Sequence, residues 1–249
     1  MVKYKYIDVL EEFVKKDIKI KYRRSYLGLV WTLLNPLMMM IIMTAVFSTL
    51  FKSSIENFFV YWLSGQIMMV YFSEATNNAM NSIIGNAPLI KKIYLPKYIF
   101  CLSKILSASV TLFSSLVALM GVMLITGAKI KITILLCIFP IFYLMVFAFA
   151  VGLLISSLAV FFRDILHLYS VFLLAWSYLT PTFYPMDILP KNVQMIVKLN
   201  PLTMIITLMR DATLYGRLSP ITLHLEIIAV CLVFLLIGGI VFYVTKDKF

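Results

Sequence analysis

The stretch ITILLCIFPIFYLMVFAFAVGLLISSLAVFF, residues Ile132–Phe162, decides the fold. It contains no Asp, Glu, Lys or Arg. A helix needs about 20 apolar residues to cross a bilayer core of roughly 30 Å. Transmembrane β-strands are shorter and alternate in polarity. The stretch therefore predicts a membrane-spanning α-helix.

The composition of the whole chain indicates the same class of protein. Of its 249 residues, 62% are hydrophobic and only 13% are charged, and the mean hydropathy is +0.98. Soluble domains average roughly 45–50% apolar and about 25% charged residues. The composition excludes a soluble globular protein and a disordered chain. Three cysteines in apolar surroundings and two histidines without ligand spacing predict neither a disulfide scaffold nor a metal site.

Intervals without charged residues predict an all-α membrane protein with six transmembrane helices in one domain, residues 1–249. We expect the spans near 28–51, 58–82, 105–127, 132–161, 165–181 and 225–245.

Charged residues predict the orientation of these spans. The net charge is +11, from 22 Lys and Arg against 11 Asp and Glu. Fifteen of the basic residues fall on one side of the predicted spans: Lys3, Lys5, Lys15, Lys16, Lys19, Lys21, Arg23, Arg24, Lys91, Lys92, Lys97, Lys104, Arg163, Lys246 and Lys248. Cytoplasmic loops collect Lys and Arg, so both termini are expected in the cytoplasm. No basic face interleaved with stacking aromatics lies outside the spans, so nucleic acid is not an expected partner.

Two segments outside the spans have helical patterns of their own. In residues 1–25, Ile7, Leu10, Val14 and Ile18 recur at helical steps among charged residues, which predicts an amphipathic helix. It lies either in the cytoplasmic headgroup region or against the bundle. The apolar, proline-punctuated segment 181–223 predicts short external helices near 185–215 that re-enter the membrane.

Candidate channel residues are polar or aromatic. Gln66, Glu74, Asn77 and Asn78 follow helical steps within the second span, where polar groups face a polar path or form interhelical hydrogen bonds. Aromatic rings stack on sugars or form an interfacial belt. The aromatic candidates are Tyr61, Trp62, Tyr71, Phe72, Trp176, Tyr178, Phe183 and Tyr184.

Two cytoplasmic features indicate contacts with a substrate or a partner. Arg23 and Arg24, between Tyr22 and Tyr26, suit a phosphate head group, or they are ordinary positive-inside anchors. The apolar loop 83–104 predicts a short amphipathic helix that docks into a partner or lies on lipid. Its candidate contacts are Pro88, Lys91, Lys92, Tyr94 and Pro96. Arg163 and Asp164, in the turn between the fourth and fifth spans, either contact the same partner or form an ion pair with each other.

The chain carries no recognisable catalytic motif. GxxxxGK[ST], GxSxG and HExxH are absent, and the aspartates are scattered singly. We expect no enzymatic activity and no cofactor in this chain.

Five motifs in order along the chain resemble the permease subunits of ABC-type polysaccharide and polyol-phosphate exporters. They are YRRSYLGLVWTLLNPL (Tyr22–Leu37), NAPLIKKIYLPKYIF (Asn86–Phe100), FFRDI (Phe161–Ile165), TPTFYPMDILP (Thr180–Pro190) and Asn200-Pro201. The family exports O-antigen, capsule or teichoic acid chains.

The resemblance implies a homodimer in a bacterial or archaeal inner membrane, with two partner ATPase subunits that bind ATP and Mg. It implies a coupling helix within residues 83–100, and external gate helices. It also implies a lipid-linked glycan that enters near Arg23 and Arg24 and passes aromatic residues. Alternatives are an ABC permease for small hydrophobic drugs or lipids, a membrane enzyme acting on polyprenyl phosphates, and an ion-coupled carrier. The last two would need convergent ionisable groups within the spans.

Overall fold

The computed structural model describes residues 2–23, 28, 30–51, 55, 57–92 and 94–248. Within these residues the secondary structure is entirely helical, which confirms the predicted all-α class. The elements are α1 (Val2–Tyr22), α2 (Val30–Phe51), α3 (Phe58–Met80), α4 (Ser82–Gly85), α5 (Ala87–Ile90), α6 (Tyr98–Ile125), η1 (Ile132–Cys137), α7 (Ile138–Phe161), α8 (Ile165–Leu179), η2 (Met186–Ile188), α9 (Lys191–Lys198), α10 (Pro201–Arg210), η3 (Asp211–Tyr215), α11 (Ile221–Thr245) and η4 (Lys246–Lys248).

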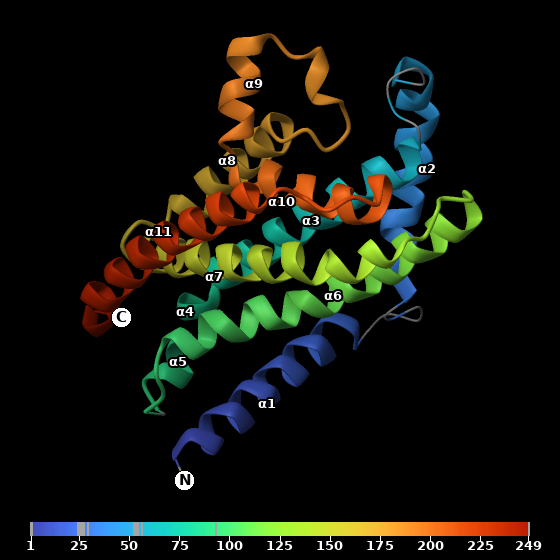
Figure 1. Ribbon diagram of the computed structural model, residues 1–249. Coiled ribbons are helices and arrows are strands. Elements are labelled where there is room, and N and C mark those ends of the chain that lie inside the picture. The colour runs from blue at the N-terminus through green and yellow to red at the C-terminus, as the bar shows by residue number, and fades with distance from the viewer. Residues whose placement is uncertain are drawn as a thin grey trace.

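Four long helices, α3, α6, α7 and α11, form a bundle (Figure 1). Helix α3 is its central member, because it packs on α6 and α7 and most of its side chains are buried. Phe72 of α3 stacks on Phe147 of α7, with ring centroids 5.3 Å apart. Both rings are fully buried and belong to one continuous apolar core.

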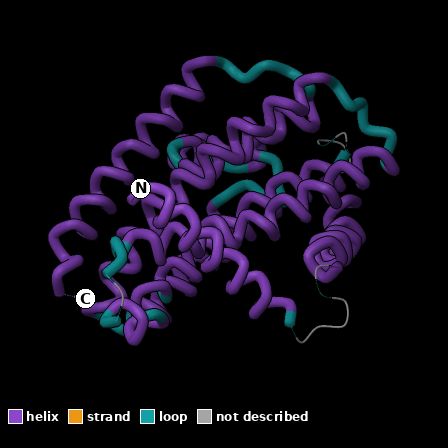
Figure 2. Tube along the Cα trace, turned by 90° about the horizontal axis from the view of Figure 1, so that it is seen from below, coloured by secondary structure: helices purple, strands orange, loops and turns teal. Residues whose placement is uncertain are grey.

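Helix α2 crosses this bundle at a steep angle. It stands upright in Figure 1 and is seen end-on in Figure 2. Its contacts are with α3 and α6, and only 17% of its most apolar window is buried within the chain. An apolar surface of this kind is suited to lipid or to a second membrane-embedded subunit.

Four described helical segments are long and apolar enough to cross a membrane: Val30–Phe47, Tyr98–Ile125, Ile132–Phe161 and Ile221–Thr245. The pair α9 and α10–η3 makes a fifth if it is counted as one span, bent by 87°. Helices also form at the other two predicted spans. However, α8 has 15 residues, fewer than a straight span needs. Helix α3 is less apolar, because it carries Gln66 and Glu74, and most of its side chains are buried among other helices.

Helix α6 begins at Tyr98, ahead of the start expected at residue 105. The expected boundary came from the charge of Lys104, but Lys104 Nζ lies 2.7 Å from Asp17 Oδ1 of α1. Since the charge is paired with another helix, the helix continues through it.

Helix α1 runs beside the first half of α6, in the same direction. Phe13 packs on Phe100 at 5.3 Å between ring centroids, and Asp17 and Lys21 contact α6 further along. Lys15 pairs with Glu11 at 2.8 Å on the exposed face, and this hydrogen bond lowers the pKa of Glu11. The described residues thus place α1 against the bundle through one face.

Short helices occupy the segment expected to contain gate helices. Pro190 precedes α9, and Pro201 is the first residue of α10, as is usual where proline starts a helix. Asn200 caps α10, because its side chain accepts a hydrogen bond from Leu202 N at 3.0 Å. Proline therefore divides this segment as the sequence predicts.

Candidate functional site

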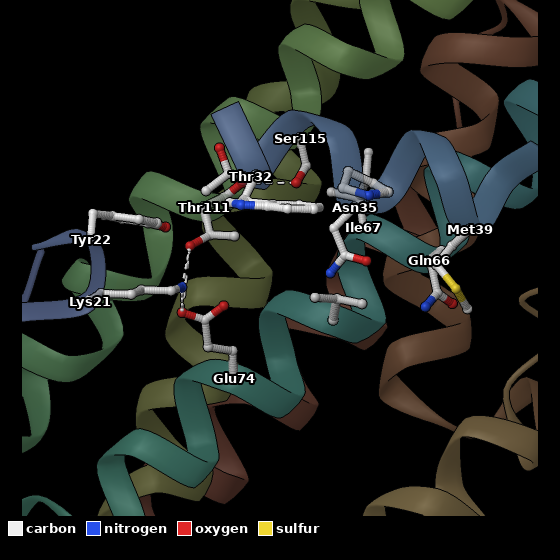
Figure 3. A pocket seen from close by; sticks show the side chains of 13 residues that line it. Lys21, Tyr22, Thr32, Asn35, Met39, Gln66, Ile67, Glu74, Thr111 and Ser115 are labelled. Atoms are coloured by element: carbon white, nitrogen blue, oxygen red, sulfur yellow. Dashed lines mark hydrogen bonds and ion pairs between the residues drawn. The ribbon is translucent and has the colours of Figure 1, made fainter. Parts of the chain in front are cut away.

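A cavity of about 330 Å³ lies between α1, α2, α3 and α6 (Figure 3). The apolar lining residues are Trp31, Pro36, Met39, Ile67 and Val70. The remaining lining side chains are polar: Lys21, Tyr22, Thr32, Asn35, Gln66, Glu74, Thr111 and Ser115. Four helices therefore contribute hydrogen-bonding groups to one space.

Helical spacing explains why these groups meet. Gln66, Val70 and Glu74 lie at successive steps of four on α3, and residues at this spacing share one face. Trp31 and Asn35 on α2 follow the same step, as do Thr111 and Ser115 on α6. Each helix thus presents one stripe to the cavity.

An ion pair closes one end of the cavity. The side chains of Lys21 and Glu74 pair with each other, and Lys21 Nζ also donates to Thr111 Oγ1 at 2.8 Å (Figure 3). The three groups join α1, α3 and α6. The side chain of Glu74 is 23% exposed, so the pair is partly withdrawn from solvent. The two charges neutralise each other within the lining.

A second cavity of about 430 Å³ lies on the far side of this pair. Both cavities are lined by Lys21, Tyr22 and Glu74. The second is also lined by Asp17, Asn78, Lys104 and Ser107. Ser107 Oγ donates to Asp17 Oδ2 at 3.3 Å, beside the Asp17–Lys104 pair. The Lys21–Glu74 pair therefore forms part of the wall between the two spaces.

A separate cluster fastens the segment after α8 to α3. Tyr61 Oη donates to Tyr184 O at 2.8 Å, and Tyr184 Oη donates to Tyr178 O at 2.8 Å. Trp176 Nε1 donates to Asn200 Oδ1 at 2.9 Å. Phe183 packs edge-on against Tyr184, with ring centroids 5.1 Å apart. These predicted channel aromatics hold the turn after α8 in one place.

Arg210 is the buried charge of this cluster. Its guanidinium carbon lies 3.5 Å from the centroid of the Tyr61 ring, and Nη2 donates to Thr182 O at 3.0 Å. A methyl group on Gly65 would lie 2.9 Å from Nη2, so only glycine leaves room for this packing. Helix α10 is thereby attached to α3.

The structure brings some predicted site residues to the cavities and leaves others apart. Tyr22, Gln66 and Glu74 line the first cavity, and Asn78 lines the second. The exposed Arg23 and the half-buried Asn77 line neither cavity. Arg24 and Tyr26 lie outside the described residues. Trp62 and Tyr71 are buried in the core, where Tyr71 Oη donates to Ile105 O at 3.3 Å.

The predicted partner contacts are at the surface. Pro88, Lys91, Lys92, Tyr94, Arg163 and Asp164 are exposed, and Pro96 is half-buried. In Figure 1 the loop after α5, the α7–α8 turn and the C-terminal end all lie at the left of the molecule. Lys97 Nζ donates to Lys246 O, which joins the loop to that end. Helices α4 and α5 are single turns of four residues each, where one coupling helix was expected.

Sequence reasoning missed Trp31, Asn35, Lys21 and Thr111 as members of the cavity. One signal for the first two was present: Asn35 stands inside an otherwise apolar span, one helical turn after Trp31. Nothing in the sequence placed Lys21 opposite Glu74, since 53 residues separate them. Within the described residues, no three His, Cys, Asp or Glu side chains gather as a metal-binding group.

Comparison with known proteins decides the family. The profile of the family described as ABC-2 type transporter matches residues 10–214. The chain belongs to the ABC-2 type transporter family. It is a membrane-embedded transport subunit of a family that works with ATP-binding subunits.

The similar curated proteins are polysaccharide export permeases. The O-antigen export system permease protein RfbA of Klebsiella pneumoniae is 28% identical over 214 residues, which cover 85% of this chain and 82% of that one. The RfbA protein of Myxococcus xanthus is 25% identical over 99% of this chain and 95% of its own. The capsule polysaccharide export inner-membrane protein CtrC of Neisseria meningitidis is 23% identical over 78% and 74%. The resemblance stated from the motifs is thus confirmed.

Proposed function

We propose that this ABC-2 permease is the transmembrane subunit of an ATP-driven exporter of lipid-linked polysaccharide. The glycan, an O-antigen-like chain or a teichoic acid, crosses the inner membrane from the cytoplasmic side. The observation that carries the proposal is the alignment with the Myxococcus xanthus O-antigen permease over nearly the whole of both chains. An alignment of that extent includes the cytoplasmic loops, the spans and the helices after α8.

The chain works as a homodimer with two ATP-binding subunits. The exposed apolar surface of α2, which is suited to lipid or to a second subunit, supports the pairing of two permease subunits. The segment from α4 to the start of α6, residues 82–97, is called the α4–α5 loop. Its exposed side chains Lys91, Lys92 and Tyr94 are accessible to an ATPase at the end of the molecule where this loop lies.

Movement of the ATP-binding subunits pushes this loop, and the two permease subunits shift as rigid bodies. The lipid head group enters near Tyr22, Arg23, Arg24 and Tyr26. The glycan leaves past α9 and α10, beside Trp176, Tyr178, Phe183 and Tyr184. The hydrogen bonds from Trp176 to Asn200 and from Tyr184 to Tyr178 hold the exit closed.

Deletion of the gene in its host tests the proposal. We expect the surface glycan to disappear and the lipid-linked glycan to accumulate inside the cell, measured by gel electrophoresis of surface and cytoplasmic-leaflet fractions. The native gene should restore export. An unchanged surface glycan, together with new sensitivity to hydrophobic drugs, would instead favour a permease for small molecules.

A double substitution, Lys91→Glu with Lys92→Glu, tests the contact with the ATPase. Like charges brought together in an interface cost several kcal/mol, so we expect export to fall about tenfold or more while the protein still inserts. The matched control is Lys129→Glu with Lys191→Glu, at an exposed residue of the α6–η1 loop and at the exposed first residue of α9. Equal export by the two double variants would contradict the coupling role of the α4–α5 loop.

A further inference from the structure

The cavity between α1, α2, α3 and α6 contains hydrogen-bonding groups that the described chain leaves unused. The amides of Asn35 and Gln66 make no hydrogen bond to any described residue. Tyr22 Oη is buried and likewise has no partner among them. Unsatisfied polar groups are costly at membrane depth, so residues there pair with each other, with water or with a substrate. These three groups are therefore placed to receive a polar ligand.

The types of these groups define the chemistry of that ligand. A side-chain amide both donates and accepts hydrogen bonds, and a phenol hydroxyl does the same. A phosphate would be matched by donors alone and a metal ion by acceptors alone. The one cation and the one anion in the lining, Lys21 and Glu74, are paired with each other. The free groups are thus suited to a neutral ligand that carries hydroxyls.

An aromatic surface lies beside the free amides. Trp31 is 47% exposed and lines the cavity one helical turn before Asn35. The flat face of an indole packs on apolar ring surfaces, while its N–H remains available for a hydrogen bond. A pyranose ring has both an apolar face and a rim of hydroxyls. The cavity volume of about 330 Å³ lies within the range of small-ligand pockets.

From these observations we infer that this cavity is a saccharide-binding subsite within a single subunit. A sugar ring packs on Trp31, and its hydroxyls bond to Asn35, Gln66 and the hydroxyl of Tyr22. The inference rests on the proposed function and adds to it a neutral sugar unit of the substrate, recognised apart from the charged head group. Thr111 and Glu74 are already engaged with Lys21, so they close the subsite at its end.

Binding to the full chain in lipid nanodiscs tests this inference. The probe is farnesyl diphosphate that carries one N-acetylglucosamine, and its reference is farnesyl diphosphate without sugar. Binding is followed by tryptophan fluorescence, and Trp31→Phe identifies the contribution of Trp31. Because two or more hydrogen bonds and a ring contact depend on the sugar, we expect the sugar-bearing probe to bind about tenfold more tightly.

Two leucine substitutions remove the amides one at a time. Asn35→Leu and Gln66→Leu should each reduce the preference for the sugar-bearing probe at least threefold, whereas Asn192→Leu, at an exposed amide of α9, should leave it unchanged. Asn35 is exposed in this structure, so its replacement removes no packing, and the melting temperature of each variant checks that it is folded. Equal affinity for the two probes, or a preference that survives both substitutions, would overturn the subsite.

The deletion experiment separates this inference from the proposed function. If deletion abolishes the surface glycan but the probes bind equally, the exporter stands and the subsite fails. If deletion leaves the glycan unchanged, the proposed function fails, whatever the probes show.

Discussion

Arg210 shows how a single residue fixes the position of a helix. Its side chain is buried, and among the described residues no carboxylate pairs with it; the adjacent Asp211 bonds instead to Arg217 Nε and Ser219 Oγ, both at 2.7 Å. A buried charge is costly unless other groups compensate for it. The ring of Tyr61 and the carbonyl groups of Tyr61 and Thr182, which accept from Nη2, supply part of that compensation, whereas Arg210 Nε has no hydrogen-bond partner among the described residues.

Replacement of Arg210 should loosen α10 from α3. Arg210→Met removes a desolvated cation–π contact worth about 2 kcal/mol and leaves buried carbonyl groups without a donor. We expect the melting temperature of the detergent-solubilised protein to fall by about 5–10 °C. Arg210→Lys should recover only part of this loss, because an ammonium lacks the planar fork of a guanidinium.

The control for this change is Lys198→Met, which removes an exposed charge from α9. It should melt within about 2 °C of the native protein, since exposed substitutions seldom exceed 0.5 kcal/mol. An Arg210→Met protein that melts like the control would show that the guanidinium does not hold α10.

Residues of this kind are the least accessible to sequence reasoning. Gln66 and Glu74 could be identified from the amino-acid sequence as polar groups in a span, because the free-energy cost of placing a polar side chain at membrane depth depends on the residue type. It gave no sign of Arg210, whose environment depends on the absence of a side chain at Gly65, far away in the chain. A contact that depends on the room left by a missing side chain can be recognised only in the three-dimensional structure.

At the scale of elements, α7 and α11 make an unusually close pair. A methyl group on Gly238 of α11 would lie 2.4 Å from Ala150 O of α7. Small residues at such crossings let two helix backbones approach and gain packing and weak hydrogen bonds. At the neighbouring Gly239, a methyl group would meet no described residue of another helix within 4 Å. Gly239 is therefore a matched control for substitutions at Gly238.

Gly238→Ala should force the two helices apart. Its methyl group would meet backbone rather than a movable side chain, and forced overpacking typically costs 1–3 kcal/mol. We expect the melting temperature to fall by about 3–10 °C, whereas Gly239→Ala should leave it equal or slightly higher because alanine favours helix. Equal melting of the two variants would show that the close approach does not contribute to stability.

The boundaries of elements were predictable where charge alone sets them. The span expected near 28–51 corresponds to α2 at Val30–Phe51, and the one near 225–245 lies within α11 at Ile221–Thr245. The start of α6 was not predictable, because Lys104 is neutralised by a residue 87 positions earlier. The charge of Lys104 does not mark the start of α6, because Asp17 of α1 pairs with it.

For the whole molecule, the loops alternate between two ends. The α4–α5 loop, the α7–α8 turn and the C-terminal end share one end in Figure 1, and the α6–η1 loop lies at the other. Fifteen of the 22 basic residues fall in the segments assigned to the first side. The positive-inside rule predicts that the end shared by these loops faces the cytoplasm.

Labelling with a membrane-impermeant maleimide tests this orientation. The starting protein replaces Cys101, Cys137 and Cys231 with alanine, since these cysteines are free thiols in the structure. A single cysteine is then placed at the exposed positions Lys92 or Lys129. In intact spheroplasts we expect Lys129→Cys to react at least tenfold faster than Lys92→Cys, and permeabilisation should make the two rates similar.

The reverse result would have consequences beyond orientation. If Lys92→Cys reacted first in intact spheroplasts, the α4–α5 loop would face away from the cytoplasm, where ATP and the ATP-binding subunits are found. The exposed side chains of Pro88, Lys91 and Tyr94 would then have no ATPase to contact. The saccharide subsite does not depend on that loop, because its groups come from α1, α2, α3 and α6. The labelling order therefore tests the cytoplasmic location of the α4–α5 loop separately from the recognition of sugar.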